Sequence, residues 1–194
     1  MPSRRSVAVA LGLGLVASVL VSTPAAANPA GSGLVISEAY GGGGNSGATL
    51  THDFVELYNP TGADISVAGW SVQYRSAAGT SATSVTPLTG SVPAGGHYLV
   101  QEAQGAGGTD ALPAPDATGS IAMSGTGGQV WLANTTTALT PPVGNVSQSD
   151  VIDFVGANTQ AASFETAAVT ANPSNTTAVA RNATGGDTDN NGAD

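Results

Sequence analysis

The sequence predicts an all-β protein built as a sandwich of two β-sheets, and three observations support this class. Short runs of β-branched and aromatic residues recur along the chain, Gly, Pro and Asn residues separate them, and helical periodicity is nearly absent after residue 27. Seven or more short strands with frequent turns are typical of a sandwich. The predicted strands cover residues 34–40, 53–58, 70–75, 97–102, 129–133, 151–155 and 177–181.

The N-terminus has the charge and hydropathy pattern of a secretory signal peptide. Arg4 and Arg5 precede an apolar run over residues 7–21. A helix needs roughly 20 apolar residues to cross a bilayer, and this run is shorter. We therefore expect an export signal and no transmembrane anchor.

Small residues mark the expected end of this signal. Ala25 and Ala27 are of the type that signal peptidase accepts, which predicts cleavage between Ala27 and Asn28. The sequence thus predicts a signal peptide over residues 1–27, one domain over residues 28–194, and a secreted, extracellular protein.

The strand predicted at 53–58 carries apolar groups on both faces, which indicates a central strand. Alternation places Val55 and Leu57 on one face and Glu56 on the other. Glu56 would then lie beside Glu38 of the preceding strand. Paired carboxylates recruit a cation or serve a glycosidase, but the interpretation that we favour is that each Glu accepts hydrogen bonds within the fold.

Turn residues connect the predicted strands. The segments 59–62 and 93–96 contain the Pro and Gly residues that reverse the chain direction. The glycine-rich segment 41–47 has neither the Lys nor the helix that would follow in a phosphate-binding loop. We interpret it as a flexible hairpin connection.

The charge of the exported chain is strongly negative. All 13 acidic residues lie after residue 27, whereas two of the four basic residues lie before it, which leaves a formal charge of −11 after cleavage. This charge disfavours direct binding to nucleic acid. Because the chain has no cysteine, stability must come from the core or from bound ions rather than from disulfides.

Six segments, in the same order along the chain, resemble the lamin tail domain family: LVISE (34–38), DFVELYN (53–59), VAGWSV (67–72), VPAGGHYLV (92–100), GQVWL (128–132) and VIDFVG (151–156). The resemblance is strongest over residues 33–160 and continues into a polar C-terminal segment, 161–194. It is similar to bacterial secreted members, which share the glycine-rich insertion and an Asp-Thr-Asp-Asn-Asn stretch. The resemblance implies an immunoglobulin-like β-sandwich.

The stretch from Asp187 to Asp194 matches the first half of a calcium-binding loop. Oxygen-bearing side chains alternate at Asp187, Asp189 and Asn191, and Gly192 allows a sharp turn. These three residues are our candidate calcium ligands. The alternative is an Asp- and Asn-rich turn without metal, and the sequence leaves both open.

The sequence offers little for catalysis. His52 and His97 are its only histidines, too few for a zinc centre and without the setting of a catalytic triad. We expect no enzyme, no catalytic residues and no cofactor apart from the calcium alternative.

These observations favour a secreted, non-catalytic interaction or adhesion module that binds an extracellular protein or glycan. The first alternative is an N-terminal accessory domain of a larger secreted nuclease or phosphoesterase, and the second is a small stand-alone hydrolase. The sequence leaves the particular partner and the oligomeric state undetermined.

Overall fold

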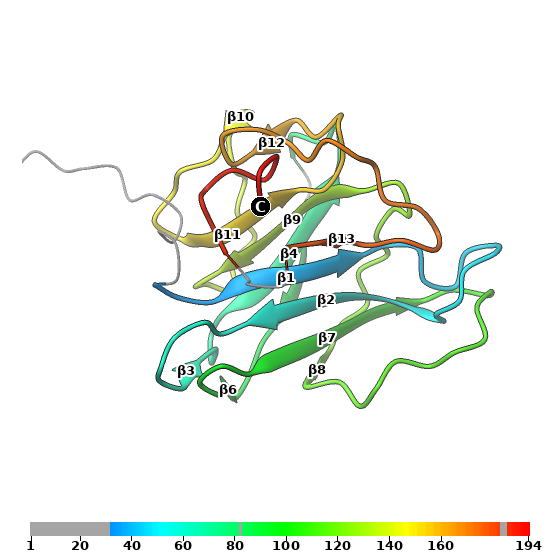
Figure 1. Ribbon diagram of the computed structural model, residues 1–194, viewed down its shortest axis with the longest axis horizontal. Coiled ribbons are helices and arrows are strands. Elements are labelled where there is room, and N and C mark those ends of the chain that lie inside the picture. The colour runs from blue at the N-terminus through cyan, green and yellow to red at the C-terminus, as the bar shows by residue number, and fades with distance from the viewer. Residues whose placement is uncertain (1–31, 82, 183–185) are drawn as a thin grey trace, which may run out of the picture.

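Two β-sheets lie face to face in the computed structural model, which describes residues 32–81, 83–182 and 186–194 (Figure 1). One sheet has five strands, in the order β13-β1-β2-β7-β8, and the other has four, in the order β11-β9-β4-β5. The described residues contain no helix. The predicted all-β, immunoglobulin-like sandwich is therefore confirmed, whereas the predicted signal peptide and its Ala27–Asn28 cleavage site lie outside the described residues.

Seven strands lie where the sequence predicts them, namely β1, β2, β4, β7, β9, β11 and β13, whereas the sequence did not predict β3, β5, β6, β8, β10 and β12. The five-stranded sheet consists of β1 (Val35–Tyr40), β2 (His52–Tyr58), β7 (His97–Gln104), β8 (Ala117–Thr118) and β13 (Val179–Ala180). The four-stranded sheet consists of β4 (Ser71–Ser76), β5 (Ser84–Pro87), β9 (Gly128–Ala133) and β11 (Val151–Gly156). Two short pairs complete the fold, β3 (Ile65–Ser66) with β6 (Ser91–Val92) and β10 (Gly144–Asn145) with β12 (Ser163–Phe164).

The main core lies between the two sheets. Strand β2 lies between β1 and β7, as its apolar residues predict, and directs Val55 and Leu57 into this core with no exposed surface. From the facing sheet, Val72 and Leu132 are equally buried. No helix in the part of the chain that is described is long and apolar enough to cross a membrane.

The four-stranded sheet is covered on its other face as well, so that every residue of β9 is buried. On that face the Trp131 ring stacks on Phe154 with their centroids 5.5 Å apart. Beside them lies the buried Arg75, which donates to Gln129 Oε1 at 2.9 Å and to Ser163 Oγ at 2.7 Å. The segment that includes β10 and β12 covers this second, smaller core (Figure 1).

The first part of the glycine-rich segment is packed, which corrects the prediction of a flexible connection. Gly43 is buried and donates to the Asp53 carboxylate at 2.9 Å, and Gly44 donates to the Leu50 carbonyl at 2.8 Å. A Cβ atom at Gly43 would lie 1.9 Å from the carbonyl carbon of His52. Glycine is required here because another chain segment lies against the backbone.

The polar C-terminal segment is part of the folded body. Strand β13 pairs with β1 at the edge of the five-stranded sheet. The last residues then fold back beside β11, where the chain ends (Figure 1). Asp187 and Asn191 of this last stretch are buried.

Candidate functional site

The three residues predicted as calcium ligands lie in one tight loop but have different environments. Asp187 is fully buried and Asn191 is 8% exposed, while Asp189 is half-buried and adopts a left-handed backbone conformation with φ of 54°. The Asp189 amide donates to Asp187 Oδ1 at 3.1 Å. The loop thus has the Asx-turn geometry that the alternative interpretation predicted.

Asn191 holds neighbouring chain segments together. Its amide oxygen accepts the backbone N–H groups of Gly156 at 2.9 Å and Glu165 at 3.0 Å. Its amide nitrogen donates to the Phe154 carbonyl at 2.7 Å and to Glu165 Oε2 at 3.0 Å. Both lone pairs of the oxygen are used, so the structure does not direct Asn191 toward an ion.

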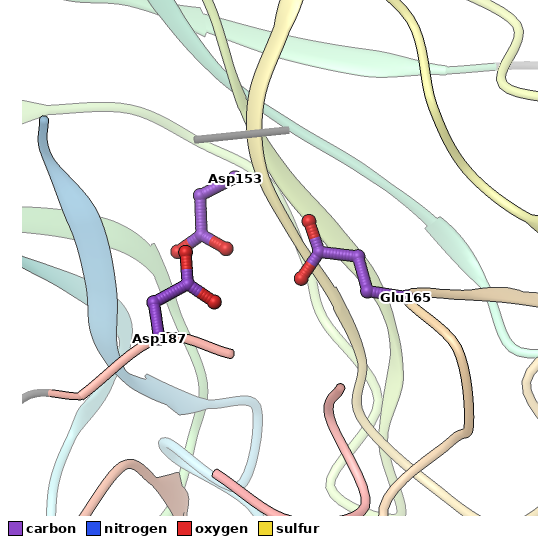
Figure 2. A group of neighbouring side chains, drawn as sticks. All are labelled: Asp153, Glu165 and Asp187. Carbon is purple, nitrogen blue, oxygen red and sulfur yellow. The ribbon is translucent and has the colours of Figure 1, made fainter. Parts of the chain in front are cut away.

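Instead, the structure brings Asp187 together with two acids that the sequence analysis did not select. Asp153 comes from β11 and Glu165 directly follows β12, and Figure 2 shows their carboxylates directed toward that of Asp187. One oxygen from each of the three lies within 4.8 Å of the others, and all three residues are buried. We call these three residues the carboxylate cluster.

Arg181 provides positive charge beside the carboxylate cluster. Its guanidinium lies 2.7 Å from Asp153, 3.3 Å from Asp187 and 3.1 Å from Asp194, and the side chain is only 5% exposed. Its Nε donates to the Ile36 carbonyl at 3.0 Å, while the Ile36 amide donates to Asp153. The cluster is therefore tied to β1 as well as to β11.

Burial and crowding perturb the acids of the cluster. Burial raises the pKa of Asp153 to about 6, although Arg181 opposes the rise. Burial, reinforced by the charges of Asp153 and Asp187, raises the pKa of Glu165 to about 9. Burial also raises the pKa of Asp187, although Arg181 opposes the rise. One arginine does not offset the cost of burying these carboxylates, so Glu165 holds a proton at neutral pH unless further positive charge is present.

A second polar site lies open to solvent on the outer face of the five-stranded sheet. It is a depression of about 370 Å³, lined by Ser37, Glu38, Glu56, Tyr58, Gly95, His97, Ala180, Arg181 and Asn182. Glu38 and Glu56 are partners in the β1–β2 register, as predicted. We call this site the outer depression.

Within the outer depression, Glu56 accepts hydrogen bonds as we expected. Ser37 Oγ and His97 Nδ1 each lie 2.8 Å from its Oε2. The His97 ring is also in contact with Tyr58, with centroids 4.8 Å apart. Burial and the charge of Glu56 raise the pKa of Glu38. The other histidine, His52, bonds to Thr51 Oγ1 at the start of β2.

The fold and these sites define a class, an immunoglobulin-like β-sandwich module with a buried acidic centre and an open polar depression. Over residues 27–192 the chain matches the Lamin Tail Domain model, and it belongs to that family. A comparison with curated proteins gave no match. The family membership confirms the resemblance found in the sequence.

Proposed function

We propose that this protein is a secreted, non-catalytic interaction module that binds an extracellular protein or glycan through the outer depression. The observation that supports this proposal most directly is the combination of side chains that line the depression. The rings of Tyr58 and His97 lie against each other beside two carboxylates, and the His97 side chain is 54% exposed. Aromatic surfaces beside polar groups provide contact area and directional hydrogen bonds together.

Two buried acids outside the depression, Asp53 and Glu102, have structural roles, which supports a non-catalytic function. Asp53 accepts the backbone amides of Gly43 and Met123, and Glu102 accepts that of Ile121. These carboxylates hold loops against the sheets, and they are only 3% and 1% exposed, so they offer a substrate almost no surface.

A binding survey tests the proposal. The purified protein is passed over immobilised polysaccharides and extracellular matrix proteins, together with the variants Tyr58→Ala and His97→Ala and the control Gln160→Ala, which changes an exposed residue outside the depression. We expect retention on at least one surface, reduced about tenfold or more in the two depression variants and unchanged in the control.

Two results would contradict the proposal. One is retention that is equal in all four proteins, because the depression would then not be the binding surface. The other is turnover of a glycan, ester or phosphodiester substrate by the wild type that Glu56→Gln abolishes, because the depression would then be catalytic.

A further inference from the structure

We propose that the carboxylate cluster binds one calcium ion that fastens the C-terminal segment to the sandwich. This site goes beyond the proposed binding function and involves different residues. Of the three ligands predicted from the sequence it keeps Asp187 and leaves out Asp189 and Asn191, and it adds Asp153 and Glu165.

The convergence of the three acids gives the ion its coordination. Asp153, Glu165 and Asp187 come from three segments, and one oxygen of each lies within 4.8 Å of the others (Figure 2). Calcium–oxygen distances of about 2.3–2.6 Å place ligand oxygens at such separations around one ion. Each oxygen of Asp153 accepts one hydrogen bond, from Arg181 or from the Ile36 amide. Each oxygen of Glu165 likewise accepts one, from the Phe154 amide or from Asn191. A lone pair therefore remains on each oxygen.

An unpartnered oxygen is the second, independent observation. Asp187 is fully buried, and its Oδ2 has no hydrogen-bond partner, while Oδ1 accepts the Asp189 amide. Asp189 Oδ1 is likewise buried without a partner. A buried carboxylate oxygen without a partner is costly, and a cation held by the cluster removes that cost at Asp187.

The charges agree with a divalent ion. Asp153, Asp187 and Asp194 all contact Arg181, and Glu165 lies beside them, so four carboxyl groups share one guanidinium in the described part of the chain. A divalent cation would largely balance the remaining negative charge. Buried charges of one sign are retained when they are paired or coordinate a metal.

The ligand type selects calcium. The cluster supplies carboxylate oxygens only, which hard cations prefer, whereas zinc sites usually include nitrogen or sulfur ligands. Mg²⁺ requires near-ideal octahedral geometry and retains several waters. The three carboxylates here are fixed by their own hydrogen bonds, and a fully buried site suits the more adaptable coordination of calcium. Asn191 acts as a positioning residue, because it holds Glu165 and β11 in place.

Thermal unfolding of EGTA-treated protein, with added CaCl₂ or MgCl₂, tests the site. At a hundredfold excess of Ca²⁺ over its Kd, we expect the Tm to rise by about 5 °C or more, because the ion binds only the folded state. Isothermal titration calorimetry with CaCl₂ should report one ion per chain. The response to Mg²⁺ should be smaller.

Two variants remove negative charge, one in the cluster and one in the same loop, and both can keep the hydrogen bond between the Asp189 amide and Oδ1 of residue 187. Asp187→Asn changes the atom that has no partner, and Asp189→Asn keeps a residue type that tolerates the left-handed backbone. We expect both to fold with an ion-free Tm at or above that of the wild type, since repulsion between the acids falls. Asp187→Asn should bind Ca²⁺ at least tenfold more weakly, and Asp189→Asn, which removes a charge near Glu165 but no ligand, should weaken binding less. The control Asp150→Asn, which changes an exposed acid, should respond as the wild type does.

Three results would overturn the proposal. These are a wild-type Tm that millimolar Ca²⁺ leaves unchanged, a calcium response that Asp187→Asn retains in full, and an equal response to Mg²⁺. Each outcome is read against the ion-free Tm of the same variant, so a loss of stability is not mistaken for a loss of binding.

Discussion

Arg181 connects three parts of the fold that are far apart in the sequence. Its guanidinium contacts Asp153 from β11 and Asp194 from the chain end, and its Nε bonds to the Ile36 carbonyl of β1. Because these partners are buried or nearly so, removing the cation leaves several carboxylates without compensation. At the scale of one residue, this side chain fixes the C-terminal segment.

We therefore predict that Arg181→Met lowers the free energy of unfolding by about 3–5 kcal/mol, the usual cost of breaking a buried ion pair. Arg181→Lys should lose less, because it keeps the charge but not the forked geometry. Urea unfolding in EGTA measures both. Equal stability of the methionine variant and the wild type would show that the ion pairs do not hold this segment.

Asp53 predicts a pH dependence of stability. Burial raises its pKa to about 6 from an ordinary value of 3.8, although the amides of Met123 and Gly43 oppose the rise. The folded state therefore binds this proton more tightly than the unfolded state. The stabilisation that the protonated Asp53 gives to the folded state is therefore complete below about pH 4 and is lost as the pH rises through about 6.

The corresponding experiment compares urea midpoints of the wild type and Asp53→Asn from about pH 4 to about pH 7. We expect the wild-type midpoint to fall more steeply across this range than that of the variant, which does not titrate. The variant should also be less stable at every pH, because Gly43 and Met123 donate to different oxygens of Asp53 and the amide nitrogen that replaces one of them cannot accept a hydrogen bond. Parallel pH profiles would rule out Asp53 as a source of the dependence.

At the scale of elements, the sequence predicts the strands well because their signals are local. Alternation in 53–58 and the glycine and proline turns sufficed to place β2 in the centre of its sheet. The candidate site was harder to predict, because its contacts are distant in sequence. The Ile36 amide meets the Asp153 carboxylate 117 residues away, and no periodicity encodes such a pair. Asp153 has one available signal, an acid within an otherwise apolar buried strand.

The packing of the glycine-rich segment was also not predictable from local sequence, and it can be tested by substitution. Gly43→Ala would drive a Cβ atom into the His52 backbone, and we predict a loss of about 3 kcal/mol in the free energy of unfolding. Gly62→Ala is the matched control, because its Cβ atom would meet open space, and it should change stability by less than about 0.5 kcal/mol. Urea unfolding distinguishes the two. A Gly43→Ala variant as stable as the control would show that this loop yields easily.

At the scale of the whole molecule, the distribution of cations matters more than the net charge. Arg75 and Arg181 are the only strong cations after residue 27. Arg75 is 2% exposed, and the Arg181 side chain is 5% exposed. Both guanidinium groups bond to other parts of the fold. The surface of the chain beginning at Asn28 therefore presents acids and hydroxyl and amide groups, no lysine and almost no exposed arginine.

Affinity for nucleic acid depends largely on surface cations that displace counterions from phosphates. We therefore predict that the chain beginning at Asn28 does not bind duplex DNA even at about 50 mM salt, where such attraction is strong. Fluorescence anisotropy of labelled DNA, in EGTA so that no divalent ion bridges the two polyanions, measures this directly. Binding that weakens as salt is added would mean that the surface has an electrostatic contact for phosphate. The expected result directs the search for a partner toward neutral glycans and basic proteins, for which the acidic rim of the outer depression is complementary.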